Sequence, residues 1–318
     1  MTPRRRALVA LNPATRQGTG MRRFETVKPL LEEAFYLDVV ATSPDRRWEG
    51  AVAAALARGI RVFVAAGGDG TVHALAGALL RARPGVPLDD LILGAVGLGS
   101  SNDFHKPVLA EFGGMPVRLD ATRLAPRDVL VARWRDDQGL EREDVVVASA
   151  SLGVTAAANG RFNRPGPVLG WLERHVLDGA ILWAAAATLL AWRNVGATLV
   201  VDGATLPVRI TNLSLLKTPW LSGGLRYDTP VSPDDGRFVL ALAHDLSLAG
   251  RFGLLLALAR GRFTGRPRTR TWHVDRASVT LERAGDLELD GEVFPARQVR
   301  VHVHPWALPV CGPGGPVA

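Results

Sequence analysis

The 318-residue sequence contains a single cysteine, Cys311. One cysteine cannot form an internal disulfide, which agrees with a reducing compartment such as the cytoplasm. Hydrophobic residues make up 47% of the chain and charged residues 22%, so the composition is that of a globular protein and excludes a disordered or fibrous one. The length predicts two domains.

The sequence also lacks long apolar runs. The longest, Ala180 to Trp192, has 13 residues, whereas a membrane-spanning helix needs roughly 20, so we predict a buried helix there. The apolar run after the N-terminal arginines, Ala7 to Leu11, is too short for a signal peptide. We therefore expect a cytoplasmic protein, with a peripheral position on the inner face of the membrane as an open alternative.

The best-known phosphate-binding and metal-binding patterns are missing as well. No glycine-rich segment continues into Gly-Lys-Ser or Gly-Lys-Thr, and no glycine spacing matches the dinucleotide-binding fingerprint. The seven histidines show no zinc spacing. The net charge of +7 favours phosphate-bearing partners in general and selects none of them.

The first third of the chain alternates short apolar strands with helical segments, which is typical of a parallel sheet in an α/β domain. A good N-cap pair, Ser43-Pro44, predicts the start of the second helix. The predicted strands are Ala7–Leu11, Tyr36–Ala41, Ile60–Ala66 and Leu91–Val96, and the predicted helices are Thr19–Phe35, Asp45–Arg58 and Thr71–Arg83.

From about residue 121 the pattern changes to strands bounded by turn residues, which favours an antiparallel β-sandwich with helical insertions. We expect a nucleotide-binding domain over 1–120 and a β-rich domain over 121–318, and leave open whether the last strand returns to the first domain. The predicted strands are Asp128–Arg135, Asp144–Ala150, Ala197–Val201, Val208–Leu213, Phe238–Ala243, Ser278–Glu282, Asp286–Leu289 and Val299–His304, and the helices are Val168–Trp192 and Ser247–Arg260.

The strongest local motif is Gly67-Gly68-Asp69-Gly70-Thr71, between a predicted strand and a predicted helix. Glycines let the backbone approach a polyphosphate, and the free amides of a helix N-terminus attract negative charge. Asp69 would repel phosphate unless Mg²⁺ intervenes or the carboxylate acts as a base toward a hydroxyl. The alternative is a tight turn in which Asp69 merely caps the helix.

Two further polar, flexible segments follow predicted strands. Asn12-Pro13-Ala14-Thr15-Arg16-Gln17-Gly18 follows the first strand, and Gly97-Leu98-Gly99-Ser100-Ser101-Asn102-Asp103-Phe104 follows the fourth. Ligands of open α/β sheets bind at the carboxyl edge of the strands, so the three segments together predict one binding site.

These loops resemble those of the bacterial diacylglycerol kinase family, which is related to sphingosine kinases. The resemblance continues into the second half, with Ser222-Gly223-Gly224-Leu225, Val231-Ser232-Pro233-Asp234-Asp235-Gly236 and Leu289-Asp290-Gly291-Glu292 in the family's order. It implies a nucleotide-binding domain of the NAD kinase and diacylglycerol kinase type, followed by the β-sandwich. It also implies transfer of the γ-phosphate of ATP to a lipid hydroxyl, with diacylglycerol giving phosphatidic acid as the family's usual reaction.

The resemblance also assigns roles to residues. Glu292 would accept the proton of the lipid hydroxyl, assisted by Asp290 and Asp69. Asn102 and Asp103 would hold their loop and reach the catalytic Mg²⁺ through water. A second, structural Mg²⁺ would be held by Asp235 with the carbonyls of Ser232 and Arg237. The implied ATP-binding residues are Asn12, Pro13, Thr42, Ala66, Gly67, Gly68, Asp69, Gly70, Thr71, Val72, Ser100, Asn102 and Asp103.

Some positions depart from the family pattern. Ser100 replaces the usual threonine and keeps a hydroxyl, Thr15-Arg16 replaces Ser-Gly, and His105-Lys106 replaces Ala-Arg. Asp290-Gly291 and Asp234-Asp235-Gly236 also read as ordinary turns, because Asp-Gly is a strong turn signal.

The segment from Leu246 to Arg270 combines five leucines and two phenylalanines that the pattern singles out with six arginines, five of them from Arg260 onward, and two interpretations are open. It is either a helix that rests on an anionic bilayer or a core helix with a solvated basic end. The alternatives for the whole chain are an NAD kinase-like enzyme and a catalytically silent nucleotide-binding or lipid-binding regulator. We expect no nucleic-acid partner, and the oligomeric state is open, a homodimer included.

Overall fold

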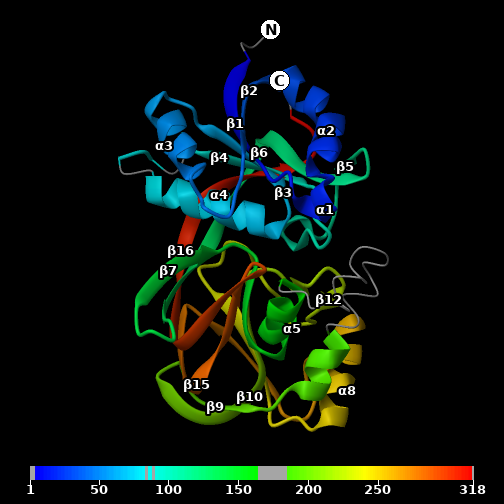
Figure 1. Ribbon diagram of the computed structural model, residues 1–318, viewed down its shortest axis with the longest axis vertical. Coiled ribbons are helices and arrows are strands. Elements are labelled where there is room, and N and C mark those ends of the chain that lie inside the picture. Colours follow the sequence, from blue (N-terminus) through cyan, green and yellow to red (C-terminus); the bar gives the residue numbers. More distant parts are fainter. Residues whose placement is uncertain (1–3, 83–84, 88–89, 164–184, 317–318) are drawn as a thin grey trace. The chain divides into compact units, whose positions relative to one another are not determined.

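The computed structural model describes residues 4–82, 85–87, 90–163 and 185–316. The chain forms two compact units (Figure 1), of which the first combines Met1–Val129 with Pro305–Ala318 and the second is Leu130–His304. The first unit thus extends to Val129, past the predicted boundary at residue 120, and also takes in the end of the chain.

The first unit is built on a parallel sheet. Its strands are β1 (Arg5–Leu11), β2 (Phe35–Ala41), β3 (Val62–Gly67) and β4 (Ile92–Gly97), in the order β4-β3-β1-β2. The first part of β6 (Met115–Arg135) pairs antiparallel with β4, and Val310 of β16 (Glu292–Pro313) pairs with Leu93 in parallel. The short β5 (Glu111–Phe112) pairs with β6.

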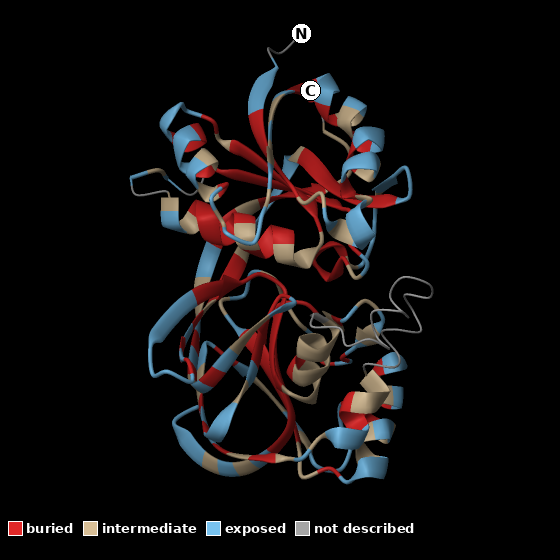
Figure 2. Cartoon of the chain, viewed as in Figure 1, coloured by how far each residue is buried: buried red, intermediate tan, exposed pale blue. Residues whose placement is uncertain are grey.

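Strands β3 and β4 are buried on both faces (Figure 2), whereas the edge strand β2 exposes Tyr36 and Val39. On one face Val62, Val64 and Ala66 share a cluster with Phe24 and Leu31 of helix α2 (Gly20–Ala34). The alternate residues of β3 point to the other face, where helix α4 (Asp69–Ala82) packs on β3 and on α3 (Glu49–Ala57). Full burial of a side chain such as Phe24 contributes about 1.5–3 kcal/mol.

The predicted strands of this unit are confirmed to within two residues, but the start of one helix is wrong. Helix α3 begins at Glu49 and not at Asp45, because Ser43 does not cap it. The Ser43 hydroxyl instead donates to Asp45 Oδ1 at 2.6 Å, and Asp45 accepts the amide of Arg47 at 3.2 Å, so the side chains stabilise a turn. The segment before α2 contains a separate turn, α1 (Thr15–Gly18).

The second unit is antiparallel throughout. Its strand order is β14-β13-β10-β8-β15-β16, with β9 paired to both β10 and β15, and β7 paired to the second part of β6. Inward side chains of these strands form one core cluster, which includes Leu152, Leu213, Leu240 and Leu287. The strands are β7 (Glu141–Val146), β8 (Ser149–Gly153), β9 (Val195–Val201), β10 (Ala204–Leu216), β13 (Phe238–His244), β14 (Thr269–Val274) and β15 (Arg276–Leu289), with the small pair β11 (Trp220–Leu221) and β12 (Leu225–Arg226).

Several strand expectations for this unit need correction. Strand β14 was not predicted, and β10 and β16 extend well beyond the predicted Val208–Leu213 and Val299–His304. The predicted strand Asp144–Ala150 is two strands, because the amides of Val147 and Ala148 bind the carboxylate of Asp290 at 2.8 Å each and leave the ladder. The separate strands predicted for 278–282 and 286–289 are one strand, β15, with a register shift between Thr280 and Gly285.

The helices of the second unit also differ in part. Helix α5 (Val154–Asn163) was not predicted, whereas α8 (Leu248–Ala259) is confirmed and Ser247 caps it by accepting the amide of Gly250 at 3.2 Å. Most of the predicted helix Val168–Trp192 lies outside the described residues. The described part, 185–191, is helical, with Leu189 buried and Leu190 exposed. Among the helices that the structure describes, none has both the length and the apolar character needed to cross a bilayer.

One buried histidine makes the first unit sensitive to acid. His105 closes the turn η2 (Asp103–His105) and packs edge-on against Phe104, with ring centroids 5.8 Å apart. Burial, together with the charges of Arg118 and Arg127, lowers the pKa of His105 from 6.5 to about 3. The folded protein therefore keeps this imidazole neutral at pH values where the unfolded chain protonates it.

We predict that the free energy of unfolding falls as the pH drops below 6.5, the ordinary pKa of histidine. Below pH 6.5 the unfolded chain binds a proton at His105 that the folded protein does not bind. The stability that the neutral imidazole contributes is therefore complete above pH 6.5 and is lost progressively as the pH falls toward the folded pKa of about 3. From about pH 7 to about pH 5 this group should cost about 2 kcal/mol.

Urea unfolding of the wild type and of His105→Gln over this pH range tests the prediction, and the variant should show the shallower pH dependence. The exposed His273 offers a matched control, since His273→Gln should keep the wild-type slope. Equal slopes for the wild type and His105→Gln would contradict the assignment.

Candidate functional site

The three loops expected to bind nucleotide emerge side by side from the first unit's sheet. In the register of the parallel strands, Leu11 pairs with Ala66 and with Ala41, and Gly67 pairs with Gly97. Asn12, Gly68 and Leu98 therefore begin their loops at the same edge, the carboxyl edge of the strands, and Thr42 lies at this edge as well. Main-chain bonds join them there, because the amide of Asn12 donates to Ala66 O at 2.9 Å and that of Thr42 to Leu11 O at 2.7 Å.

Two of these loops approach each other so closely that only glycine fits. A Cβ atom on Gly99 would lie 2.6 Å from the Cα of Gly68, and a Cβ atom on Gly67 would lie 2.1 Å from Thr71 Oγ1. Real Cβ atoms do not come so near. A side chain at position 99 would push the two loops apart, and one at position 67 would displace Thr71 of the same loop. Glycine at position 99 therefore lets the backbones of these two loops lie close together.

Asn102 holds the loop that follows β4. Its side-chain amide donates to Gly99 O at 3.0 Å and to Gly97 O at 3.4 Å, and its Oδ1 accepts the amide of Gly99 at 3.1 Å. Asn102 itself has φ +48°, a left-handed conformation that asparagine tolerates better than most residues. The geometry matches a positioning role for this residue.

Polar contacts also connect the loops to one another. Asp69 Oδ1 accepts the amide of Phe104 at 2.9 Å, and Arg16 Nε donates to Gly99 O at 3.1 Å. Asp103 is paired with Lys106 at 2.7 Å, and both side chains are largely buried. Arg16 and Lys106, which depart from the family pattern, thus hold the loops in place.

One group at the start of α4 is available for a ligand. The hydroxyl of Thr71 is buried and has no hydrogen-bond partner among the residues that the structure describes. A buried hydroxyl without a partner is costly, and it lies at a helix N-terminus, where amides attract anions. Phosphate oxygens would satisfy both features.

The carboxylates predicted to be catalytic in the second unit have very different surroundings. Asp290, at φ +48° in the β15–β16 turn, is buried and accepts the amides of Val147, Ala148 and Ser149 at 2.8, 2.8 and 2.9 Å. Glu292 is exposed, and no hydrogen bond or ion pair joins its carboxylate to the described residues. Of the two carboxylates, Glu292 is the one without hydrogen-bond donors among the described residues.

The same turn contains a carboxylate that the sequence reasoning missed. Glu288 is buried, and its two oxygens accept the Ser151 hydroxyl and the Gly291 amide, each at 2.6 Å. Its position between Leu287 and Leu289 on a strand was the available signal, because alternation places it on the opposite face from those leucines. Glu288 and Asp290 together fix the backbone that carries Glu292.

The predicted structural metal site lies in the loop before β13. Ser232 Oγ donates to Asp234 Oδ1 at 2.8 Å, and the amide of Arg237 donates to Asp235 Oδ1 at 3.0 Å. The ammonium of Lys217 also reaches this loop. Among the described residues no group of three or more His, Cys, Asp or Glu side chains could hold a metal ion, but the predicted set relies mainly on carbonyl oxygens.

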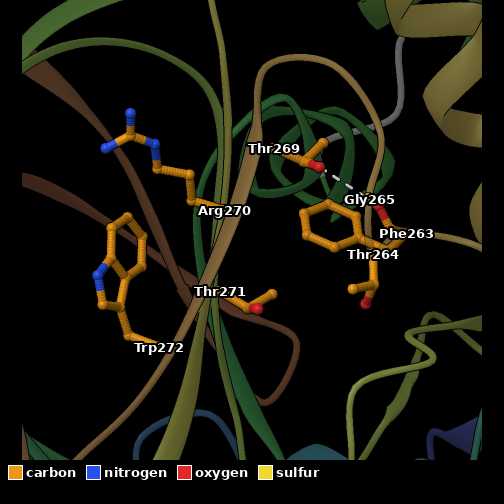
Figure 3. Close-up of a pocket in the computed structure, with 7 residues that line it drawn as sticks. All are labelled: Phe263, Thr264, Gly265, Thr269, Arg270, Thr271 and Trp272. Atoms are coloured by element: carbon orange, nitrogen blue, oxygen red, sulfur yellow. Dashed lines mark hydrogen bonds between the residues drawn. The ribbon is translucent and has the colours of Figure 1, made fainter.

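A pocket of about 330 Å³ opens elsewhere in the second unit, along the edge strand β14 (Figure 3). Arg270 and Trp272 point to one side of this strand and Thr269 and Thr271 to the other, while the Thr269 hydroxyl donates to Phe263 O at 3.3 Å. None of the predicted catalytic, nucleotide-binding or metal-binding residues lines it.

Comparison with known structures shows the fold. A diacylglycerol kinase from Bacillus anthracis str. Sterne superposes with a TM-score of 0.66 over 96% of each chain at 14% sequence identity. A second structure from the same organism gives a TM-score of 0.70 over 96% of each chain at 15% identity. Yeast NADH kinase in complex with NADH gives 0.49 at 12% identity, over 98% of this chain and 83% of its own. No curated protein matches the chain in sequence.

Family models account for most of the chain. Residues 6–124 match the diacylglycerol kinase catalytic domain, and residues 148–312, more than half of the chain, match the YegS C-terminal NAD kinase β-sandwich-like domain. These matches confirm the expected fold class, an α/β domain followed by a β-sandwich. The chain belongs to the lipid kinase-like family that joins a diacylglycerol kinase catalytic domain to a YegS C-terminal domain.

Proposed function

We propose that this protein is an ATP-dependent lipid kinase, and that diacylglycerol is its acceptor and phosphatidic acid its product. The observation that carries the proposal is the convergence of three polar, glycine-containing loops at one sheet edge, beside the buried Thr71 hydroxyl, which has no hydrogen-bond partner among the described residues. Such a site suits a polyphosphate. Family membership supports the kinase activity, and the choice of diacylglycerol follows the family's usual reaction.

In the proposed reaction the lipid hydroxyl oxygen forms a bond to the γ-phosphorus, the bond to the bridging oxygen of ADP breaks, and Glu292 takes the hydroxyl proton. Asn12, Thr42, Ser100 and the residues from Ala66 to Val72 bind and orient ATP. Magnesium bound with ATP neutralises the phosphate charge, which is the main demand of phosphoryl transfer. Asp69 and Asp103 offer carboxylate oxygens at this edge, of the kind that Mg²⁺ prefers.

The two carboxylates of the β15–β16 turn have separate tasks in this proposal. Glu292 is exposed and reacts, whereas Asp290 acts as a positioning residue, because three backbone amides already donate to its oxygens. The assisting role expected for Asp290 is therefore indirect: it holds the turn in shape.

We predict that Glu292→Gln lowers kcat by about 100-fold or more, the usual contribution of a positioned general base, and leaves ATP affinity unchanged. A radiolabelled ATP transfer assay with diacylglycerol vesicles measures kcat, and isothermal titration calorimetry measures ATP affinity. The exposed Glu141 provides a control, since Glu141→Gln also removes one negative charge, at a position far from Glu292 in the sequence. Full activity of Glu292→Gln would refute its role as the base.

We predict that Gly99→Ala weakens ATP binding by about tenfold or more, because the new methyl group collides with the backbone at Gly68. Overpacking of this kind costs about 1–3 kcal/mol, and each 1.4 kcal/mol is a factor of about ten in affinity. Gly50→Ala is the matched control, because a Cβ atom there meets nothing within 4 Å. If Gly99→Ala bound ATP as tightly as the wild type, the loop that contains Gly99 would not be part of the nucleotide site.

A lipid substrate implies contact with a bilayer, and α8 offers a suitable face. Leu248, Phe252 and Leu256 recur every four residues on this helix and are 45%, 40% and 53% exposed, while Leu254 and Leu258 on the other side are buried. Arg260 and Arg262, both exposed, follow its end. An exposed apolar stripe beside basic residues suits the surface of an anionic membrane.

We predict that the protein sediments with vesicles containing anionic phospholipid at low salt, and that Phe252→Glu with Leu256→Glu abolishes this binding. Acidic side chains in the stripe would be repelled by the headgroups and could not enter the acyl boundary. Leu140→Glu, at an exposed turn between β6 and β7, should bind as the wild type does. Failure of the wild type to bind at low salt would remove the docking face from the proposal.

A further inference from the structure

Lys217 is a buried lysine directly after β10. Its side chain is only 1% exposed, and the preceding residues Leu213 to Leu216 belong to the core of the unit. An ammonium group removed from water is strongly destabilising unless oxygen atoms replace its hydration. The oxygen atoms around the Lys217 side-chain nitrogen therefore mark a place in the second unit where a cation is bound.

The oxygens that Lys217 reaches belong to the loop predicted to bind structural Mg²⁺. Its Nζ donates to the carbonyl oxygen of Arg237 at 2.5 Å and to Asp235 Oδ1 at 3.4 Å. Asp235 Oδ1 also accepts the amide of Arg237 at 3.0 Å, which closes the loop on itself. Two of the three predicted metal ligands are thus the partners of a lysine.

A magnesium ion and this ammonium do not fit together on the same oxygens. Mg²⁺ requires oxygen ligands at about 2.0–2.1 Å in a near-octahedral shell, and two cations that share a carbonyl and a carboxylate oxygen lie close enough to repel each other strongly. Lysine is a compact point charge with three donors, so it can take the place of a small cation. We infer that the ammonium of Lys217 replaces the structural metal in this chain.

The replacement has a consequence for the turn that carries Glu292. The backbone amide of Lys217 donates to Ala148 O at 2.8 Å, and the amide of Ala148 donates to Asp290 Oδ1 at 2.8 Å. Lys217 thus joins the 231–237 loop to the segment that Asp290 holds. Because this cation is covalently attached, the arrangement does not depend on the concentration of free Mg²⁺.

The inference rests on the proposed function only for which residues were expected to hold the structural Mg²⁺. Its tests use neither ATP nor lipid. A failed kinase assay and a failed cation assignment are therefore distinguishable. The magnesium that accompanies ATP is a separate ion and is unaffected by it.

The first test measures Mn²⁺ binding to the nucleotide-free full chain by electron paramagnetic resonance. We expect the wild type and Asp235→Asn to bind the same amount of MnCl₂, because Asp235 holds no metal. Asp234→Asn, a neighbouring exposed carboxylate, controls for the loss of local charge. A Mn²⁺ site that is present in the wild type and in Asp234→Asn but lost in Asp235→Asn would overturn the inference.

The second test compares thermal unfolding of the wild type and Lys217→Met. The wild-type Tm should be the same in EDTA and in MgCl₂. Lys217→Met should lower Tm by roughly 5 °C or more, since it removes the buried cation that joins Asp235 and the carbonyl of Arg237 to β10. A wild-type Tm that rises with MgCl₂, or a Lys217→Met Tm equal to that of the wild type, would contradict the replacement. If Lys217→Met does not fold, the Mn²⁺ comparison, which needs no change at Lys217, decides the question.

Discussion

Gly67 and Gly97 occupy paired positions on neighbouring parallel strands, and the candidate nucleotide site depends on that register. Because the four strands end level with one another, the segments that follow them begin at one edge, as is usual for ligand sites of open α/β sheets. The Gly68–Gly99 approach then sets how close two of these loops come. The register of the strands sets where these loops begin, and hydrogen bonds from Asn102, Asp69 and other polar side chains stabilise the loops there.

The second unit depends on buried charges that are fully supplied with partners. Asp290 accepts three backbone amides, Glu288 accepts a hydroxyl and an amide, and the Lys217 ammonium donates to two oxygens of one loop. Groups of this kind add little net stability but fix conformation, since leaving any partner unmatched is expensive. The exposed Glu292 then stands on a turn that its neighbours have made rigid.

This division between fixed and available groups supports the proposed chemistry. A carboxylate saturated with donors cannot easily accept a proton, whereas one without such partners can, provided that the backbone beneath it does not move. The first unit shows the same pattern, because Asp103 is paired with Lys106 while the Thr71 hydroxyl has no partner among the described residues. The Glu292 carboxylate and the Thr71 hydroxyl, which have no hydrogen-bond partner among the described residues, are both groups that the proposed reaction uses.

The sequence by itself determined most of the strands and helices, the α/β domain followed by a β-sandwich, and the family, because apolar periodicity, glycine placement and motif spacing are local properties. It missed helix α5 and strand β14. It did not determine where β7 ends and β8 begins, since the Asp290 carboxylate that interrupts them lies 142 residues from Ala148. It also did not reveal the buried Glu288, or that Lys217 meets the Asp235 loop. Those contacts join residues far apart in the chain, so only the tertiary structure, which brings the strands together, could decide them.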